Sequence, residues 1–334
     1  MIDLKALKPN KVSYDWHKQT IAIFAPPKFG KSTFMYELLG QEALFIATED
    51  GHDAIPGIIS QRVYSVSDIK EVIWQIDELC QSNECPFKAV VFDTVDNLET
   101  MIQKYVCSQA GVVNMGDIGH GKLYAEYDKV LNGLINDLKA LKIGVHFIGH
   151  VKQKKVEDKI NKIEYEKFMP SVAERTQKII LSDAYFMPFI FNKLGEDGSE
   201  TRMMAFRDTF QWLSGSRYKY MPPFTLLNVD AFKEAVNNAI KAEEEAKKGS
   251  TTTETKVEAK KELDFKSIMA RGSELGAKFQ AANQIDKLMD AVTEILGTDE
   301  NGKPRMFNQL KESQVEIANV LVMKLEKLAK ELGI

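Results

Sequence analysis

The chain has 334 residues, of which 44% are apolar and 28% charged, and its formal net charge is −4. This length suffices for one large domain and a smaller one, and the composition is ordinary for a soluble protein. The net charge excludes a global electrostatic attraction to nucleic acid, so any such contact requires a local basic patch. No apolar stretch approaches the roughly 20 residues of a membrane span, and we expect no membrane partner.

The N-terminal residues and the cysteines both bear on the compartment. Residues 1–5, Met-Ile-Asp-Leu-Lys, lack the apolar core of a signal peptide, which predicts a cytoplasmic location. Cys80, Cys85 and Cys107 are irregularly spaced, as in a reducing compartment, and no Cys/His pair complements the first two. We therefore expect neither a disulfide framework nor a zinc site.

The first predicted strand, Ile21–Phe24, leads through a turn with Pro and Gly into a helical segment. The turn reads Ala25-x-x-x-x-Gly30-Lys31-Ser32, a phosphate-binding P-loop whose first glycine has become alanine. Backbone N–H groups of such a loop, together with the following helix N-terminus, face phosphate oxygens. A plain Gly-Lys surface turn is the alternative. The residues expected to bind the nucleotide are Pro27, Lys28, Phe29, Gly30, Lys31, Ser32 and Thr33.

The P-loop residue types predict ATP and Mg²⁺ as ligands. We expect Lys31 to contact the β- and γ-phosphates and the Ser32 hydroxyl to complete a Mg²⁺ shell. Asp93 ends the buried strand Phe87–Asp93, where P-loop ATPases place a second Mg²⁺ ligand; a turn cap is the alternative for an isolated Asp. The predicted metal ligands are therefore Ser32 and Asp93.

Two further strand ends carry candidate catalytic residues. Glu49 ends the strand Ala43–Thr48 and is placed to orient the attacking water as general base, although Asp50 competes for this role. His150 ends the strand Gly144–His150, where a polar side chain can sense the γ-phosphate; a hydrogen-bonded strand-end histidine is the alternative. We expect Lys31, Glu49 and His150 to act together at one site.

The elements between these strands complete an α/β pattern. Gln61–Val66 is a further strand candidate, and Ser67 or Asp68 is the expected cap of the next helix. Helical patterns follow near Asn97–Gln109 and Lys122–Leu141. Alternating strands and helices predict a mostly parallel sheet that is flanked by helices.

The second half of the chain changes character. Val151–Phe168 has six lysines against four acids and is predicted to be a β-hairpin or a mobile loop. Two more strands, Asp183–Phe191 and Thr201–Arg207, and a short helix, Ala231–Lys241, complete the first domain. The expected organisation is a domain over 1–241, a flexible linker or fraying helix over 242–262, and a helical module over 263–334, with helices at 288–296 and 314–332 around a turn at 301–302.

The order of these motifs resembles the RecA/KaiC-type ATPase core. The P-loop Ala25–Thr33, the strand end Thr48–Gly51 and the strand Val90–Leu98 carry this resemblance. The segments Gly119–Lys122, Val145–Val156 and Ser214–Arg217 are similar, more narrowly, to phage nucleotide-binding ATPases that include Sak-type single-strand annealing proteins. The resemblance covers roughly residues 15–225, and neither the linker nor the module.

This resemblance implies a RecA-like core and an ATPase that binds single-stranded DNA and promotes annealing or homologous recombination in phage DNA metabolism. It implies a homo-oligomer, a ring or a filament, in the cytoplasm of a bacterial host. The module at 263–334 is expected to recruit a partner such as a single-strand binding protein. Ala25 departs from the family's usual glycine, and we expect hydrolysis to be slow or to be stimulated by DNA.

The resemblance also assigns residue roles. Glu49 is the implied base, and Arg217 is the implied residue that reaches a neighbouring subunit's nucleotide, with Arg202 and Arg207 as rivals. Ser214–Arg217 lacks the lysine often found two residues before that arginine. DNA contacts are expected on the loops Gly111–Lys122 and Val151–Phe168, through Lys122, Lys152, Lys154 and Lys155, although a mixed-charge hairpin is often simply solvated.

Two alternative functions stay open at the sequence level. One is a nucleotide-switched scaffold or loader in replication or recombination that does not grip DNA directly. The other is a small-molecule kinase, which the absence of a recognisable acceptor-binding lid and the presence of Glu49 disfavour.

Overall fold

The computed structural model describes residues 14–158, 162–246, 264–298 and 303–334. The chain divides into two compact units, Met1–Thr255 and Lys256–Ile334. Most of the linker predicted at 242–262 lies outside the described residues, as does the turn predicted at 301–302. No helix of the described part is both long and apolar enough to cross a membrane.

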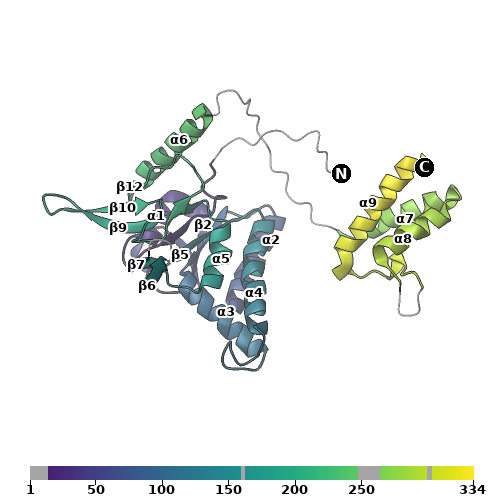
Figure 1. The fold of residues 1–334 in the computed structure, drawn as a ribbon, viewed down its shortest axis with the longest axis horizontal. Coiled ribbons are helices and arrows are strands. Elements are labelled where there is room, and N and C mark those ends of the chain that lie inside the picture. Colours follow the sequence, from purple (N-terminus) through teal and green to yellow (C-terminus); the bar gives the residue numbers. More distant parts are fainter. Residues whose placement is uncertain (1–13, 159–161, 247–263, 299–302) are drawn as a thin grey trace. The chain divides into compact units, whose positions relative to one another are not determined.

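An eight-stranded sheet forms the centre of the first unit, in the order β12-β10-β9-β1-β5-β4-β2-β3. Figure 1 shows β9 and β10 side by side at one edge of this unit. The strands from β9 to β3 pair in parallel, whereas β10 and β12 are added antiparallel at one edge. The predicted mostly parallel sheet is therefore confirmed. The strands are β1 (Ala22–Phe24), β2 (Ala43–Ala47), β3 (Ile59–Arg62), β4 (Ala89–Asp93), β5 (Gly144–Gly149), β9 (Phe189–Leu194), β10 (Glu200–Ala205) and β12 (Phe224–Leu226).

Both faces of this sheet are apolar, because β1 and β2 consist of consecutive buried apolar residues, as does β4 up to Phe92. Along β1, Ala22 and Phe24 enter one hydrophobic cluster, while Ile23 enters the other. Helices cover the two faces and complete these clusters. One face packs against α2 (Val66–Gln81), α3 (Val95–Gln109), α4 (Lys122–Ala140) and α5 (Glu174–Ser182), and the other against α1 (Lys31–Leu39) and α6 (Val229–Ala246).

The lysine-rich segment forms a β-hairpin, which was one of the two predicted alternatives. Its strands are β6 (Val151–Asp158) and β7 (Ile163–Pro170), and they pair antiparallel from Val151–Pro170 to Asp158–Ile163. The segment that follows α5 divides into β8 (Phe186–Met187) and β9 rather than forming one strand. β8 pairs with β11 (Gly215–Ser216).

Two predicted helix boundaries were wrong. α2 is capped by Ser65, not by Ser67 or Asp68, because the Ser65 hydroxyl and the Asp68 carboxylate each bond to the other's backbone N–H. α6 runs from Val229 to Ala246, beyond the helix predicted at Ala231–Lys241, because Ala-Glu-Glu-Glu-Ala at 242–246 consists of strong helix formers.

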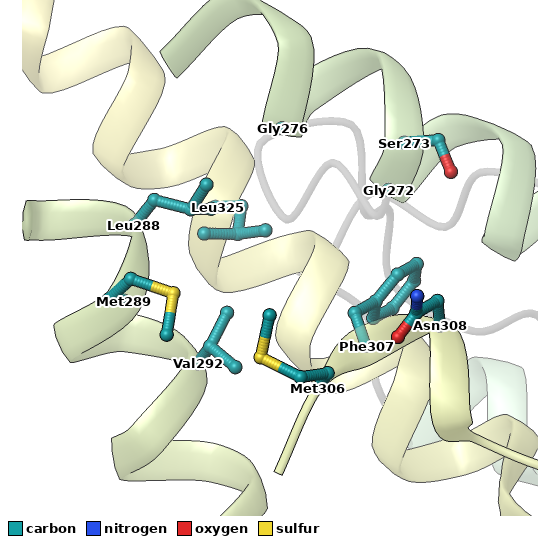
Figure 2. A pocket seen from close by; sticks show the side chains of 10 residues that line it. All are labelled: Gly272, Ser273, Gly276, Leu288, Met289, Val292, Met306, Phe307, Asn308 and Leu325. Carbon is teal, nitrogen blue, oxygen red and sulfur yellow. The ribbon is translucent and has the colours of Figure 1, made fainter. Parts of the chain in front are cut away.

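The second unit has three α-helices in its described part, α7 (Phe265–Ala281), α8 (Ile285–Leu296) and α9 (Val315–Leu332). The sequence predicted only the last two. All three contribute to one hydrophobic cluster, with Phe279, Val292 and Leu321 among its buried members. An apolar pocket of about 210 Å³ opens between them, lined by side chains such as Met289 and Met306 (Figure 2).

Candidate nucleotide-binding site

The P-loop connects β1 to α1 and has the backbone that its sequence predicts. Gly30 is the N-cap of α1 with a φ of 84°, a left-handed conformation that favours glycine. Lys28 also has a positive φ, of 66°, whereas Ala25 is not among the positive-φ residues. The alanine therefore needs no glycine-like backbone, and it is instead fully buried against the second face of the sheet.

Lys31, the first residue of α1, points back across the loop. Its side chain is buried, with the residue 6% exposed, and Nζ donates to the carbonyl oxygens of Ala25 and Pro26 at 3.1 and 3.0 Å. Burial lowers the pKa of the Lys31 ammonium, while the carboxylates of Asp93, Glu49 and Asp96 oppose this shift. The Lys31 ammonium group is thus held over the P-loop by two backbone carbonyl oxygens.

Ser32 and Asp93 meet as the predicted metal ligands. The Ser32 hydroxyl donates to Asp93 Oδ2 at 2.5 Å, and Asp93 is 3% exposed at the end of β4. A hydroxyl and a carboxylate are hard oxygen ligands, the donor type that Mg²⁺ prefers. These two residues therefore fit a Mg²⁺ ion at this position.

Glu49 and His150 face one another beside the loop. Glu49 Oε1 lies 3.6 Å from His150 Nε2, and Thr94 Oγ1 donates to the other carboxylate oxygen at 3.4 Å. Interaction with the His150 ring lowers the pKa of Glu49, although partial burial opposes this. The same interaction raises the pKa of His150, again against partial burial. The glutamate is therefore an ionised group, as a general base requires.

His150 connects the site to Lys31 on one side and to the β6–β7 hairpin on the other. Its Nδ1 lies 3.4 Å from Lys31 Nζ, and its backbone N–H donates to Asp96 Oδ2 at 2.9 Å. Directly after β7, the Ser171 hydroxyl donates to Asp96, and the Ser171 backbone N–H donates to the His150 carbonyl oxygen at 2.9 Å. The preceding residue, Gly149, leaves room for the Phe24 ring, because a Cβ there would lie 2.5 Å from that ring.

The three candidate arginines occupy different places. Arg217 donates to the carbonyl oxygens of Ser182 and Ala184 at the end of α5, and Arg207 donates to those of Lys219 and Met221. Arg202, on β10, lies over the Phe29 ring at 5.7 Å from its centroid. Its Nη1 is also 3.6 Å from the position that a Cβ on Gly30 would take. Within the chain, only Arg202 of these three is placed against the P-loop.

The lysines predicted to bind DNA are exposed, and two of them have protein partners. Lys152 Nζ donates to the Ser171 carbonyl at 2.7 Å, and Lys154 forms an ion pair with Glu174 on α5. Lys155 lies on β6 opposite Glu166, and Lys122 begins α4. These four residues thus lie on the hairpin and at one helix start, outside the cluster around Lys31.

Sequence reasoning missed His52 in the site. This residue follows Glu49 by one short turn, and its Nε2 lies 2.9 Å from Asp93 Oδ2. A histidine directly after a strand-end acid and a glycine was the available signal. It was overlooked because Glu49 and Asp50 already supplied candidate acids there.

Comparison with known proteins agrees with this geometry. The profile of a family described as AAA domain matches residues 17–218, which include every residue of the cluster and none of the second unit. The chain is also 24% identical over 324 residues to the SPbeta prophage-derived uncharacterized protein YorG of Bacillus subtilis (strain 168), and the match covers 94% of both chains. With its P-loop at the carboxyl edge of a mostly parallel sheet, the chain belongs to the AAA domain family of P-loop NTPases.

Proposed function

We propose that the protein is a Mg²⁺-dependent, RecA-like ATPase that binds single-stranded DNA and promotes annealing or recombination in phage DNA metabolism. The P-loop NTPase domain and the prophage-derived relative support a nucleotide-dependent role of this kind. The observation that carries the ATPase part is the meeting of Lys31, Ser32, Asp93 and Glu49 at the carboxyl ends of three parallel strands.

The proposed reaction is hydrolysis of ATP to ADP and phosphate. Glu49 accepts a proton from water as the water oxygen bonds to the γ-phosphorus, and the bond from that phosphorus to the bridging oxygen of ADP breaks. Lys31 leaves its loop carbonyls to contact the β- and γ-phosphates. Mg²⁺, bound through Ser32 and Asp93, would neutralise charge on the same phosphate oxygens.

An arginine completes the proposed site. Arg217 would act on a neighbouring subunit's nucleotide, but its guanidinium already donates to two backbone carbonyls. Arg202 has no such bond among the described residues and lies against Phe29 and Gly30 of its own chain. The geometry therefore favours Arg202, which would act within one subunit rather than across an oligomer interface.

The proposed coupling to DNA passes from His150 to the hairpin. His150 faces Glu49 and Lys31, and its backbone shares Asp96 with Ser171 at the end of β7. A γ-phosphate that moved His150 would thereby reposition the strand that carries Lys152 and Lys154. The second unit lies outside the AAA domain match, and we assign to it the contact with a partner such as a single-strand binding protein.

A nucleotide-switched scaffold or loader that does not grip DNA is the second candidate. It is favoured by the contacts of Lys152 with the Ser171 carbonyl and of Lys154 with Glu174, since paired lysines are poorer phosphate ligands. In this alternative the same link through His150 changes a protein-binding surface.

The ATPase rate with and without single-stranded DNA separates the two candidates. The wild type is compared with Lys152→Ala/Lys154→Ala and with Lys104→Ala/Lys129→Ala, which removes two exposed lysines from α3 and α4. The recombinase proposal expects DNA to change hydrolysis in the wild type and the control pair, and the hairpin variant to lose this response. If DNA neither binds nor alters hydrolysis at low salt, the result refutes the recombinase proposal and supports the scaffold or loader.

A further inference from the structure

A buried histidine contacts the metal-binding carboxylate from the segment that follows Glu49. The side chain of His52 is only 10% exposed, and its Nε2 lies 2.9 Å from Asp93 Oδ2. The Phe45 ring meets the imidazole edge-on, with 5.5 Å between the ring centroids. Packing and a hydrogen bond therefore fix the imidazole in one orientation.

The hydrogen bonds to Asp93 from the described residues all reach one of its two carboxylate oxygens, Oδ2. A carboxylate oxygen only accepts, so His52 Nε2 carries a proton and donates it. Oδ2 thus accepts from both His52 and the Ser32 hydroxyl. No hydrogen bond from a described residue reaches Oδ1, which leaves that oxygen for a cation or its water shell.

The other nitrogen of His52 argues against a role in folding alone. Nδ1 is buried and has no hydrogen-bond partner among the described residues. An unpaired buried polar atom destabilises the folded state, and an apolar side chain against Phe45 would avoid that cost. The histidine is thus explained by what Nε2 does for Asp93.

We propose that His52 is a positioning residue that sets the rotation of the Asp93 carboxylate and presents Oδ1 to the metal. This inference deepens the proposed function and rests on it, because it assumes a metal-nucleotide complex at Ser32 and Asp93. Partners that hydrogen-bond to metal ligands typically change metal affinity or activity by about 10–100-fold when they are removed. The short segment from Glu49 to His52 thus carries the proposed base and also contacts the metal-binding carboxylate of Asp93.

The test measures metal affinity directly, by electron paramagnetic resonance titration of Mn²⁺ into the protein with ADP. We expect His52→Phe, which keeps a ring but loses the donor, to weaken Mn²⁺ binding about 10–100-fold. His52→Gln, which keeps an N–H at a similar reach, should restore most of it. Asp53→Asn is the matched control on the same turn and should bind Mn²⁺ like the wild type. ADP affinity in EDTA should be unchanged in all three variants.

The outcomes separate this inference from the function beneath it. Wild-type Mn²⁺ affinity in a folded His52→Phe, checked by circular dichroism, overturns the positioning role. If His52→Phe does not fold, His52→Asn, whose amide stops short of Asp93, is compared with His52→Gln, and equal affinities overturn the role as well. A wild-type protein that binds no ADP at all would instead refute the nucleotide site itself.

Discussion

The carboxyl edge of the sheet and the β6–β7 hairpin carry the two halves of the proposed function, and they differ in how their charged side chains are held. At the sheet edge, Lys31 and Asp93 are 6% and 3% exposed and are bonded to neighbouring groups. On the hairpin, the side chain of Lys154 is 48% exposed and forms an ion pair with Glu174 across the surface. Solvent screens the second kind of contact far more than the first.

This difference in burial indicates where a single substitution should have a large effect on activity. Parallel strands impose the positions of Ser32, Glu49 and Asp93, so the removal of one group leaves its partners in a buried or half-buried site. On the hairpin, the exposed ion pair of Lys154 with Glu174 is screened by solvent, so we expect the removal of either lysine, Lys152 or Lys154, to have a small effect. We therefore expect the strongest losses from substitutions at the sheet edge and the weakest from substitutions on the hairpin surface.

Glu49→Gln removes the proposed base and keeps the shape of the side chain. We expect hydrolysis to fall by about 10²–10⁴-fold, while binding of a fluorescent ATP analogue is retained. Asp50→Asn is the matched control, because the Asp50 side chain is 95% exposed and lies 3.6 Å from Arg62. Equal loss in both variants would show that the segment, rather than Glu49 itself, matters.

Lys31→Ala removes the buried ammonium from the loop. A preorganised charge at a developing phosphoryl group typically contributes about 10²–10³-fold to the rate, and we expect at least that loss in steady-state ATPase assays. Lys28→Asn removes the other lysine of the loop, which is exposed, and asparagine tolerates its positive φ. A Lys28 variant as inactive as the Lys31 variant would contradict the assigned roles.

Arg202→Ala should lower hydrolysis by roughly 10–100-fold, the effect of one lost charge-assisted hydrogen bond. Since Arg202 lies against its own P-loop, the specific activity should not depend on protein concentration.

Arg217→Ala should mainly lower the melting temperature, because Arg217 bonds to carbonyls at the end of α5. An Arg217 variant that is stable and inactive, with activity that rises with concentration, would favour action across subunits.

Lys154→Ala and Lys152→Ala should weaken single-stranded DNA binding only modestly at low salt. Loss of two phosphate contacts would reduce the slope of log affinity against log salt by about 1.4. Fluorescence anisotropy over a salt series measures this slope, with Lys104→Ala/Lys129→Ala as the control. An unchanged slope would remove both lysines from any DNA interface.

The smallest expected effect is the pH dependence of stability from Glu49 and His150. Because the pKa of Glu49 is lowered, Glu49 stabilises the fold at pH values above its ordinary pKa of about 4.3. Because the pKa of His150 is raised, His150 stabilises the fold at pH values below its ordinary pKa of about 6.5. The contribution is lost as pH falls through the Glu49 pKa or rises through the His150 pKa. His150→Gln should therefore lower stability most between about pH 4.5 and 6.5, by less than about 1 kcal/mol.

Thermal unfolding at several pH values measures this effect, with His120→Asn, at an exposed histidine, as the control. A difference between wild type and His150→Gln that stays constant with pH would show that the pair does not titrate as described.

The sheet could be predicted from local patterns, and so could the meeting of Asp93 and Glu49 at one of its edges. Asp93 and Glu49 each follow a run of buried apolar residues, and parallel strands bring such ends to one edge. The role of His52 could not be predicted in the same way, because it depends on a contact with Asp93, which is distant in the sequence. The placement of Arg202 against the P-loop likewise depends on β10 lying two strands away from β1.

Helix limits were predicted less well, and for different reasons. α7 was missed because Gly272 and Gly276 interrupt its helical pattern, although Gly272 is needed where a Cβ would lie 2.3 Å from the Phe307 ring. The cap at Ser65 was missed because three neighbouring residues can all serve as caps, and only the reciprocal bond with Asp68 decides between them.

A crystal structure of the chain with Mg²⁺ and a non-hydrolysable ATP analogue would show whether the P-loop binds the triphosphate as proposed. We predict the triphosphate along the backbone N–H groups of residues 29–33, with Lys31 Nζ turned from Ala25 and Pro26 to the β- and γ-phosphates. Mg²⁺ should be bound at Ser32 and Asp93, with Glu49 and His150 facing the γ-phosphate. A nucleotide bound elsewhere, or one bound here with Lys31 still on its loop carbonyls, would refute the proposed nucleotide site.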